Sequence, residues 1–202
     1  MSSKAGFSLT ELAVVVAIIM AVTGVSLPSI ARTLDNAKLT AAAQQVASLY
    51  QSGRIQATQD NNYYVLPVFN NTQGSGICLD LDGDGACSTA EPQAQMPSRV
   101  RLSNTGIPVQ PSAATLGFTN SLTTTENSGN YGQQGTLEPG LAWNALGLPC
   151  SRSSATSPCS GGLAWVQYLQ LPRAGGEVLY AAVIVSPTGN VRIWHYSAGS
   201  WF

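Results

Sequence analysis

Apolar residues are spread very unevenly along the chain, and the densest run lies near its N-terminus. From Leu12 to Ala31 no side chain is charged. A helix needs about 20 apolar residues to cross a bilayer, so this run predicts a transmembrane helix over residues 7–29. Glu11 stands at the head of the run. Because an unpaired carboxylate at membrane depth is costly, Glu11 is a candidate functional residue that needs a cationic partner.

A helical pattern continues beyond this run. Pro28 lacks a backbone N–H, which predicts a kink rather than the end of the helix. Residues 30–60 then predict an amphipathic second half of the helix, whose apolar side packs on a sheet. The apolar positions on that side are Leu39, Ala42, Ala43, Val46, Leu49 and Tyr50. Asp60-Asn61-Asn62 predicts the end of the helix.

The remaining residues, 61–202, predict a β-rich globular head. Runs rich in strand-forming residues are Tyr63–Phe69, Ile77–Leu81, Arg99–Leu102, Leu163–Leu171, Val178–Val185 and Val191–Tyr196. Ser186-Pro187-Thr188-Gly189 predicts a hairpin turn between the last two runs. A helix followed by strands favours the α+β class, with the long N-terminal helix packed on an antiparallel β-sheet head.

The length, charge and motifs of the chain limit the kinds of function that it can have. A chain of 202 residues is long enough for one anchor and one globular domain. Only 9% of its residues are charged and the net charge is −1, so the totals carry no electrostatic signature of nucleic-acid binding. His195 is the sole histidine, and neither a Gly-x-Ser-x-Gly elbow nor a phosphate-binding glycine loop is present. The sequence therefore predicts a protein that is not an enzyme.

Four cysteines fall into two pairs of equal spacing, Cys78 with Cys87 and Cys150 with Cys159. In an exported domain an even number of cysteines favours disulfides. The sequence allows three connectivities, of which we favour the two local bridges. Zinc binding is the competing use, but neither pair has the short spacing of a zinc knuckle.

The stretch Asp80–Glu91 matches the pattern of a calcium-binding loop. It has acids at positions one, three and five, glycine at six, an oxygen-bearing side chain at nine and glutamate at twelve. The predicted ligands to Ca²⁺ are Asp80, Asp82, Asp84, the carbonyl of Ala86, Ser88 and Glu91. A solvated acidic turn stays an alternative, because Asp-Gly-Asp-Gly is also a turn signal and the flanks do not resemble paired EF-hand helices.

Gly6-Phe7-Ser8-Leu9-Thr10-Glu11, placed after a short leader with Lys4, resembles the prepilin signature of type IV pilins and type II secretion pseudopilins. The resemblance implies that residues 1–6 are a leader peptide. A prepilin peptidase would cut between Gly6 and Phe7 and methylate the new N-terminus. It also implies that Glu11 pairs with the N-terminal amine of a neighbouring subunit during assembly. A cleaved secretory signal or an ordinary signal anchor is the alternative, but neither accounts for Glu11.

Three further stretches, residues 35–47, 143–149 and 185–192, resemble GspH/FimT-type pseudopilins. The resemblance implies a minor structural subunit of a type IV pilus or a type II secretion pseudopilus. It would sit in the bacterial inner membrane by a single pass, with its head in the periplasm or outside, and would contact other subunits and the peptidase. Some members grip DNA through a Gly-Arg-x-Arg hairpin. Here Gly189-Asn190-Val191-Arg192 lacks one arginine, so we do not expect nucleic-acid binding.

The alternative function is a pilus-tip subunit for adhesion or DNA uptake. Clustering of Arg99, Arg101 and Arg192 on the head would favour nucleic acid, whereas scattered positions would favour assembly alone. The aromatic end of the chain, with Trp194, Trp201 and Phe202, is either core or a contact surface, and core packing is the simpler expectation.

Overall fold

The computed structural model describes residues 8–71, 74–85, 87–102, 106–107, 122–124, 141–151, 160–161, 164–173 and 176–202. Within these ranges, side chains are not described for residues 24–29, 70–71, 122–124, 151 and 160–161. The chain divides into two compact units, Met1–Ala37 and Lys38–Phe202.

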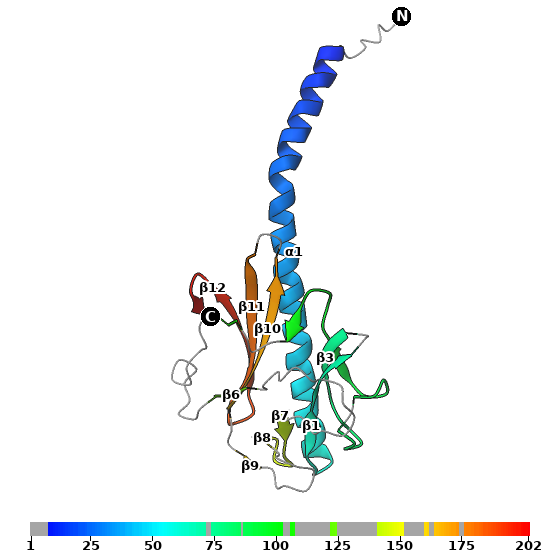
Figure 1. The fold of residues 1–202 in the computed structure, drawn as a ribbon, viewed down its shortest axis with the longest axis vertical. Helices are drawn as coiled ribbons and strands as arrows, with labels where there is room; N and C mark the ends of the chain where they lie inside the picture. The colour runs from blue at the N-terminus through cyan, green and yellow to red at the C-terminus, as the bar shows by residue number, and fades with distance from the viewer. Residues whose placement is uncertain are drawn as a thin grey trace, which may run out of the picture. The chain divides into compact units, whose positions relative to one another are not determined.

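The first element, α1 (Leu9–Gln59), is an α-helix that includes Pro28 and contributes residues to both units (Figure 1). In the second unit the buried face of α1 carries Leu39, Val46 and Tyr50. These positions are seven and four residues apart, the spacing that places side chains on one side of a helix. The polar side chains between them, such as Gln44 and Gln45, are exposed.

The described strands form three sheets. The first contains β1 (Tyr64–Leu66), β7 (Leu141–Trp143), β8 (Pro149–Ser151) and β9 (Ser160–Gly161). The second contains β2 (Val68–Asn71), β3 (Gly74–Cys78) and β4 (Gln93–Gln95). The third contains β5 (Arg101–Leu102), β6 (Leu122–Thr124), β10 (Ala164–Pro172), β11 (Val178–Val185), β12 (Val191–Ser197) and β13 (Ser200–Trp201).

The third sheet has the strand order β13-β12-β11-β10-β5, with β6 beside β10 (Figure 1). One of its faces joins the main hydrophobic core, which also contains α1 residues and side chains from the other two sheets. The sheet contributes Trp165, Leu169 and Val183, among others, to this core. The opposite face, called the outer face below, has its own cluster around Val166, Tyr168, Ala182 and Ile184. The sheet is therefore apolar on both faces.

The structure corrects the predicted fold class. Among the described residues no helix is long and apolar enough to cross a membrane. This contradicts the predicted transmembrane half of the helix and the predicted single-pass location in the bacterial inner membrane. The predicted single antiparallel sheet is also wrong, because the strands form three sheets and β6 runs parallel to β10.

Two local predictions can be compared with the strands directly. β11 has the bounds predicted for it, and it pairs with β12 through a turn in which the N–H of Ser186 donates to the carbonyl of Asn190 at 2.9 Å. The predicted hairpin is therefore confirmed. The predicted strand Tyr63–Phe69 is divided into β1 and β2 at Pro67, because proline has no N–H to donate to a ladder.

Candidate functional site

The N-terminus of α1 is closed by a reciprocal pair of hydrogen bonds between Ser8 and Glu11. The N–H of Ser8 donates to Oε2 of Glu11 at 2.9 Å, and the N–H of Glu11 donates to Oγ of Ser8 at 3.2 Å. This is a capping box, in which Ser-x-x-Glu satisfies backbone donors that the first helical turn leaves without partners. Glu11 therefore has a local role in the single chain. Gly6 and Phe7, the predicted processing residues, lie outside the described residues.

Large apolar side chains on the first unit are exposed. They are Leu9, Leu12, Val14, Val15, Val16, Ile18, Ile19, Met20, Val22, Ile30 and Leu34. Successive helical residues point about 100° apart, so three consecutive valines and the pair Ile18 and Ile19 face different directions. The exposed apolar surface consequently surrounds this part of α1 and is not confined to one stripe.

The acidic loop brings three of its predicted ligands together. Carboxylate oxygens of Asp80, Asp82 and Asp84 lie within 4.8 Å of one another, and this cluster could hold a metal ion. Asp80 is buried, whereas Asp82 and Asp84 are exposed. Burial raises the pKa of Asp80, and hydrogen bonds from the N–H groups of Gly83 and Gly85 partly offset this effect. Those bonds measure 2.7 Å and 3.0 Å.

The other predicted ligands are placed differently. Glu91 is buried, and its carboxylate accepts hydrogen bonds from the N–H of Leu81 and the N–H of Ser88, both at 2.8 Å. It thus ties the two arms of the loop together and is not part of the aspartate cluster. Ser88 is exposed, and Ala86 lies outside the described residues.

A disulfide crosses the same loop. Cys78, at the end of β3, is bonded to Cys87, with 5.8 Å between their Cα atoms, which confirms the first predicted bridge. The bond joins the residue two before Asp80 to the eighth position of the loop, so it restricts the backbone that carries the aspartates. Cys150 is also disulfide-bonded, and Cys159 lies outside the described residues.

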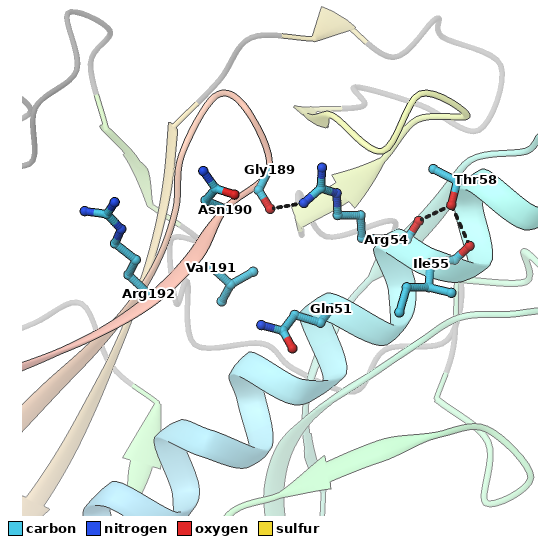
Figure 2. Close-up of a pocket in the computed structure, with 8 residues that line it drawn as sticks. All are labelled: Gln51, Arg54, Ile55, Thr58, Gly189, Asn190, Val191 and Arg192. Atoms are coloured by element: carbon cyan, nitrogen blue, oxygen red, sulfur yellow. Dashed lines mark hydrogen bonds between the residues drawn. The ribbon is translucent and has the colours of Figure 1, made fainter.

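Sequence reasoning missed a pocket of about 620 Å³ between α1 and the β11–β12 turn (Figure 2). Gln51, Arg54, Ile55 and Thr58 line it from the helix, and Gly189, Asn190, Val191 and Arg192 line it from the hairpin. The guanidinium of Arg54 donates from Nη1 to the carbonyl of Gly189 at 2.9 Å. Arg54 is also 6.0 Å from the ring centre of Trp143. Figure 2 shows Arg192 directed away from Arg54, so the two cations do not converge.

Two glycines allow Arg54 to reach the hairpin. Gly189 has φ +83°, and a Cβ built there would lie 2.7 Å from the carbonyl oxygen of Gly147 and 3.0 Å from Cζ of Arg54. Gly147 has φ +70°, and its Cβ would lie 3.2 Å from Nε of Arg54. The sequence signal for this arrangement was present in the turn-ending glycines of Asn144-Ala145-Leu146-Gly147 and Ser186-Pro187-Thr188-Gly189, but nothing in it indicated Arg54 as their shared neighbour.

Of the three arginines used to discriminate nucleic-acid binding, Arg99 and Arg101 are two residues apart, whereas Arg192 lies on another strand. Arg101 lies on β5 and Arg192 on β12, with β10 and β11 between them. The guanidinium of Arg99 donates to the carbonyl of Pro172. The three arginines therefore do not form one cluster, which a nucleic-acid surface needs. His195 is half-buried, and burial lowers its pKa.

No protein-family model, no curated protein and no solved structure matches this chain.

Proposed function

We propose that the chain is a structural subunit of a filament, a minor pilin or pseudopilin that is trimmed between Gly6 and Phe7 and assembles through α1. The observation that carries the proposal is the exposed apolar surface that residues 9–22, Ile30 and Leu34 give to α1. Burying apolar surface yields roughly 25 cal/mol per Å², so a helix that is apolar on every side is strongly stabilised by neighbours on every side. Copies of similar helices, packed side by side, supply such neighbours.

A filament requires contacts between subunits that repeat without closing into a ring. When one face of a subunit binds a different face of the next, the contact repeats without closing and produces an open helical filament. Packing around α1 is of this kind if successive subunits are displaced along the helix axis. Glu11 then lies near the N-terminus of a neighbouring helix, where the amine created at Phe7 provides a positive partner for a desolvated carboxylate.

The capping box supplies a sharp test, because it separates two roles of Glu11. Glu11→Gln keeps an oxygen that accepts from the N–H of Ser8 but removes the negative charge, since glutamine also serves at this position of a capping box. Ser8→Ala removes the hydroxyl that accepts from the N–H of Glu11 but keeps the charge. If Glu11 acts through an intermolecular ion pair, the glutamine variant stays out of filaments and the alanine variant enters them.

The experiment scores both variants and the wild type in purified filaments, and determines the N-terminus of each by mass spectrometry. We expect Phe7 to be the first residue in all processed chains. Normal incorporation of Glu11→Gln would show that Glu11 acts only as a helix cap. Filament-borne chains that still begin at Met1 would refute the proposed processing.

We further propose that the metal held by the aspartate cluster is Ca²⁺. The cluster offers only oxygen ligands, which hard cations prefer, and the spacing of Asp80, Asp82 and Asp84 is that of a calcium loop. Three carboxylates within 4.8 Å repel one another, and a divalent cation removes that repulsion. Its role is to stiffen the loop that the Cys78–Cys87 bridge already restricts.

A further inference from the structure

The pocket between α1 and the β11–β12 turn has apolar side chains on both of its walls. Ile55 lines it from the helix and is 54% exposed, although it is a large apolar residue. Val191 lines it from the hairpin and is partly exposed (Figure 2). Covering apolar surface that lies in water is favourable. A ligand that brings an apolar group into this pocket is therefore stabilised by contact with both walls.

Charge at the pocket has one sign. Arg54 and Arg192 line it, and none of the described residues that line it carries a carboxylate. The guanidinium of Arg54 donates to the carbonyl of Gly189, a neutral acceptor, so the positive charge of Arg54 still acts on the pocket. Arg192 is exposed, and Figure 2 shows it directed away from Arg54. The pocket therefore favours a ligand that combines an apolar group with negative charge.

The acidic loop of this chain has that chemistry. Leu81 is 41% exposed, and it is followed by Asp82 and Asp84, which are both exposed. Gly83, with φ +75°, turns the backbone between the two aspartates. The three carboxylates of the aspartate cluster exceed the charge of one divalent cation, so the loop is negative with or without a bound metal. The segment thus presents an apolar side chain next to negative charge.

We propose that this pocket binds the acidic loop of a second copy of the chain. Leu81 of one copy covers Ile55 and Val191 of the next, and Asp82 lies near Arg192. No described residue of the loop lines the pocket of its own chain, so a second copy supplies it. The loop and the pocket are different surfaces, and a contact between different surfaces can repeat from copy to copy. The contact is therefore compatible with a filament but is independent of packing between α1 helices.

The test measures cross-links between copies of the purified full-length chain. One batch carries Leu81→Cys and a heavy isotope label, and the other carries Ile55→Cys and no label. Detergent covers the exposed apolar side chains of the first unit, which suppresses assembly through α1. A short bismaleimide links the introduced thiols and leaves the native disulfides closed. Mass spectrometry then counts links between heavy and light peptides, which are intermolecular by construction.

We expect these links to form in at least about tenfold higher yield than in a control pair. The control replaces Ile55→Cys by Gln45→Cys, which is also an exposed position of α1 but lies outside this pocket. A yield no higher than that of the control would refute the proposal. The same result would follow if an acidic segment of a different protein filled the pocket, so it would count against self-recognition in either case.

Charge reversal tests the ionic part of the contact. Arg192→Glu in the Ile55→Cys chain should lower the yield of links about tenfold, because it replaces attraction to the aspartates by repulsion. Arg101→Glu is the matched control, since it makes the same charge change at an exposed position of β5, outside the pocket. Equal yields in the two variants would refute the proposal. Because detergent removes α1 packing from the measurement, failure here would leave the assembly proposal intact.

Discussion

The carboxylate of Glu91 accepts a hydrogen bond from the backbone N–H of Leu81 at 2.8 Å. Its second oxygen accepts from the N–H of Ser88. The last acid of the loop thus holds the first and eighth residues after Asp80 together through direct hydrogen bonds. We therefore expect the loop to keep its shape when no cation is bound, and a cation to add stability chiefly through the three aspartates.

Calcium should raise the thermal unfolding midpoint of the full-length chain. A ligand that binds only the folded state stabilises it by about 2.7 kcal/mol at 100 times its dissociation constant. Asp80→Asn should abolish this rise, because it removes a carboxylate from the centre of the cluster. Asp60→Asn, outside the loop, is the control and should keep it. Differential scanning fluorimetry with calcium or with a chelator measures the effect, and an unchanged wild-type midpoint would contradict the calcium proposal.

Replacement of Gly189 by alanine should destabilise the head much more than replacement of Gly199. Both glycines have positive φ, +83° and +86°, so both variants incur the backbone strain of about 1 kcal/mol. A Cβ at Gly199 meets nothing within 4 Å, but one at Gly189 meets the carbonyl of Gly147 at 2.7 Å. Overpacking adds about 1–3 kcal/mol at Gly189 alone. Chemical denaturation of both variants measures the difference, and equal losses would show that the contact to Gly147 is unimportant.

Removal of the hydroxyl should have different effects on the free energy of unfolding at two tyrosines of the outer face. The hydroxyl of Tyr168 is buried and has no hydrogen-bond partner among the described residues, and its burial raises its pKa to about 12. The hydroxyl of Tyr180 donates to the carbonyl of Gly106 at 2.8 Å. Tyr168→Phe should leave stability unchanged or raise it, whereas Tyr180→Phe should lower it by about 1 kcal/mol. Urea unfolding of both variants measures the two changes. A lower free energy of unfolding in Tyr168→Phe would contradict the prediction, because it would show that the buried hydroxyl contributes to stability.

Acidification should destabilise the head partly through His195, the sole histidine. Burial holds the pKa of His195 below the 6.5 of an exposed histidine. The unfolded chain therefore takes up the proton first as the pH falls. The stability contributed by neutral His195 is fully present above pH 6.5 and is lost as the pH falls through the lower pKa of the folded state. Between pH 7.5 and 5 the unfolding midpoint should fall further in the wild type than in His195→Gln, and parallel curves would contradict this.

The sequence predicted those features that depend on neighbouring residues. The β11–β12 hairpin follows from a turn tetrapeptide between two runs of strand formers, and the Cys78–Cys87 bridge follows from local spacing. The aspartate cluster follows from a twelve-residue pattern. Each of these signals is complete within a short segment, so no knowledge of the distant chain was needed.

Features that depend on distant residues were missed or wrong. Whether Arg101 and Trp201 lie on the same face of the third sheet depends on the registers of four successive strand pairs, none of which a local pattern specifies. The division into three sheets likewise depends on long-range pairing, such as that of Tyr64 with Trp143. A local signal can also be ambiguous. Glu91 was predicted as a metal ligand from its position in the pattern, but the same carboxylate satisfies two backbone donors within the loop, and the pattern does not distinguish these uses.

The contact of Arg54 with Gly147 and Gly189 has a consequence for how this protein can change during evolution. A side chain at either glycine displaces the guanidinium, but one at Gly189 also meets the carbonyl oxygen of Gly147, whatever residue stands at position 54. In related chains position 147 should therefore covary with position 54, whereas position 189 should stay glycine in either case. Chains that have lost the arginine should tolerate asparagine or another residue at position 147 more readily than chains that retain it.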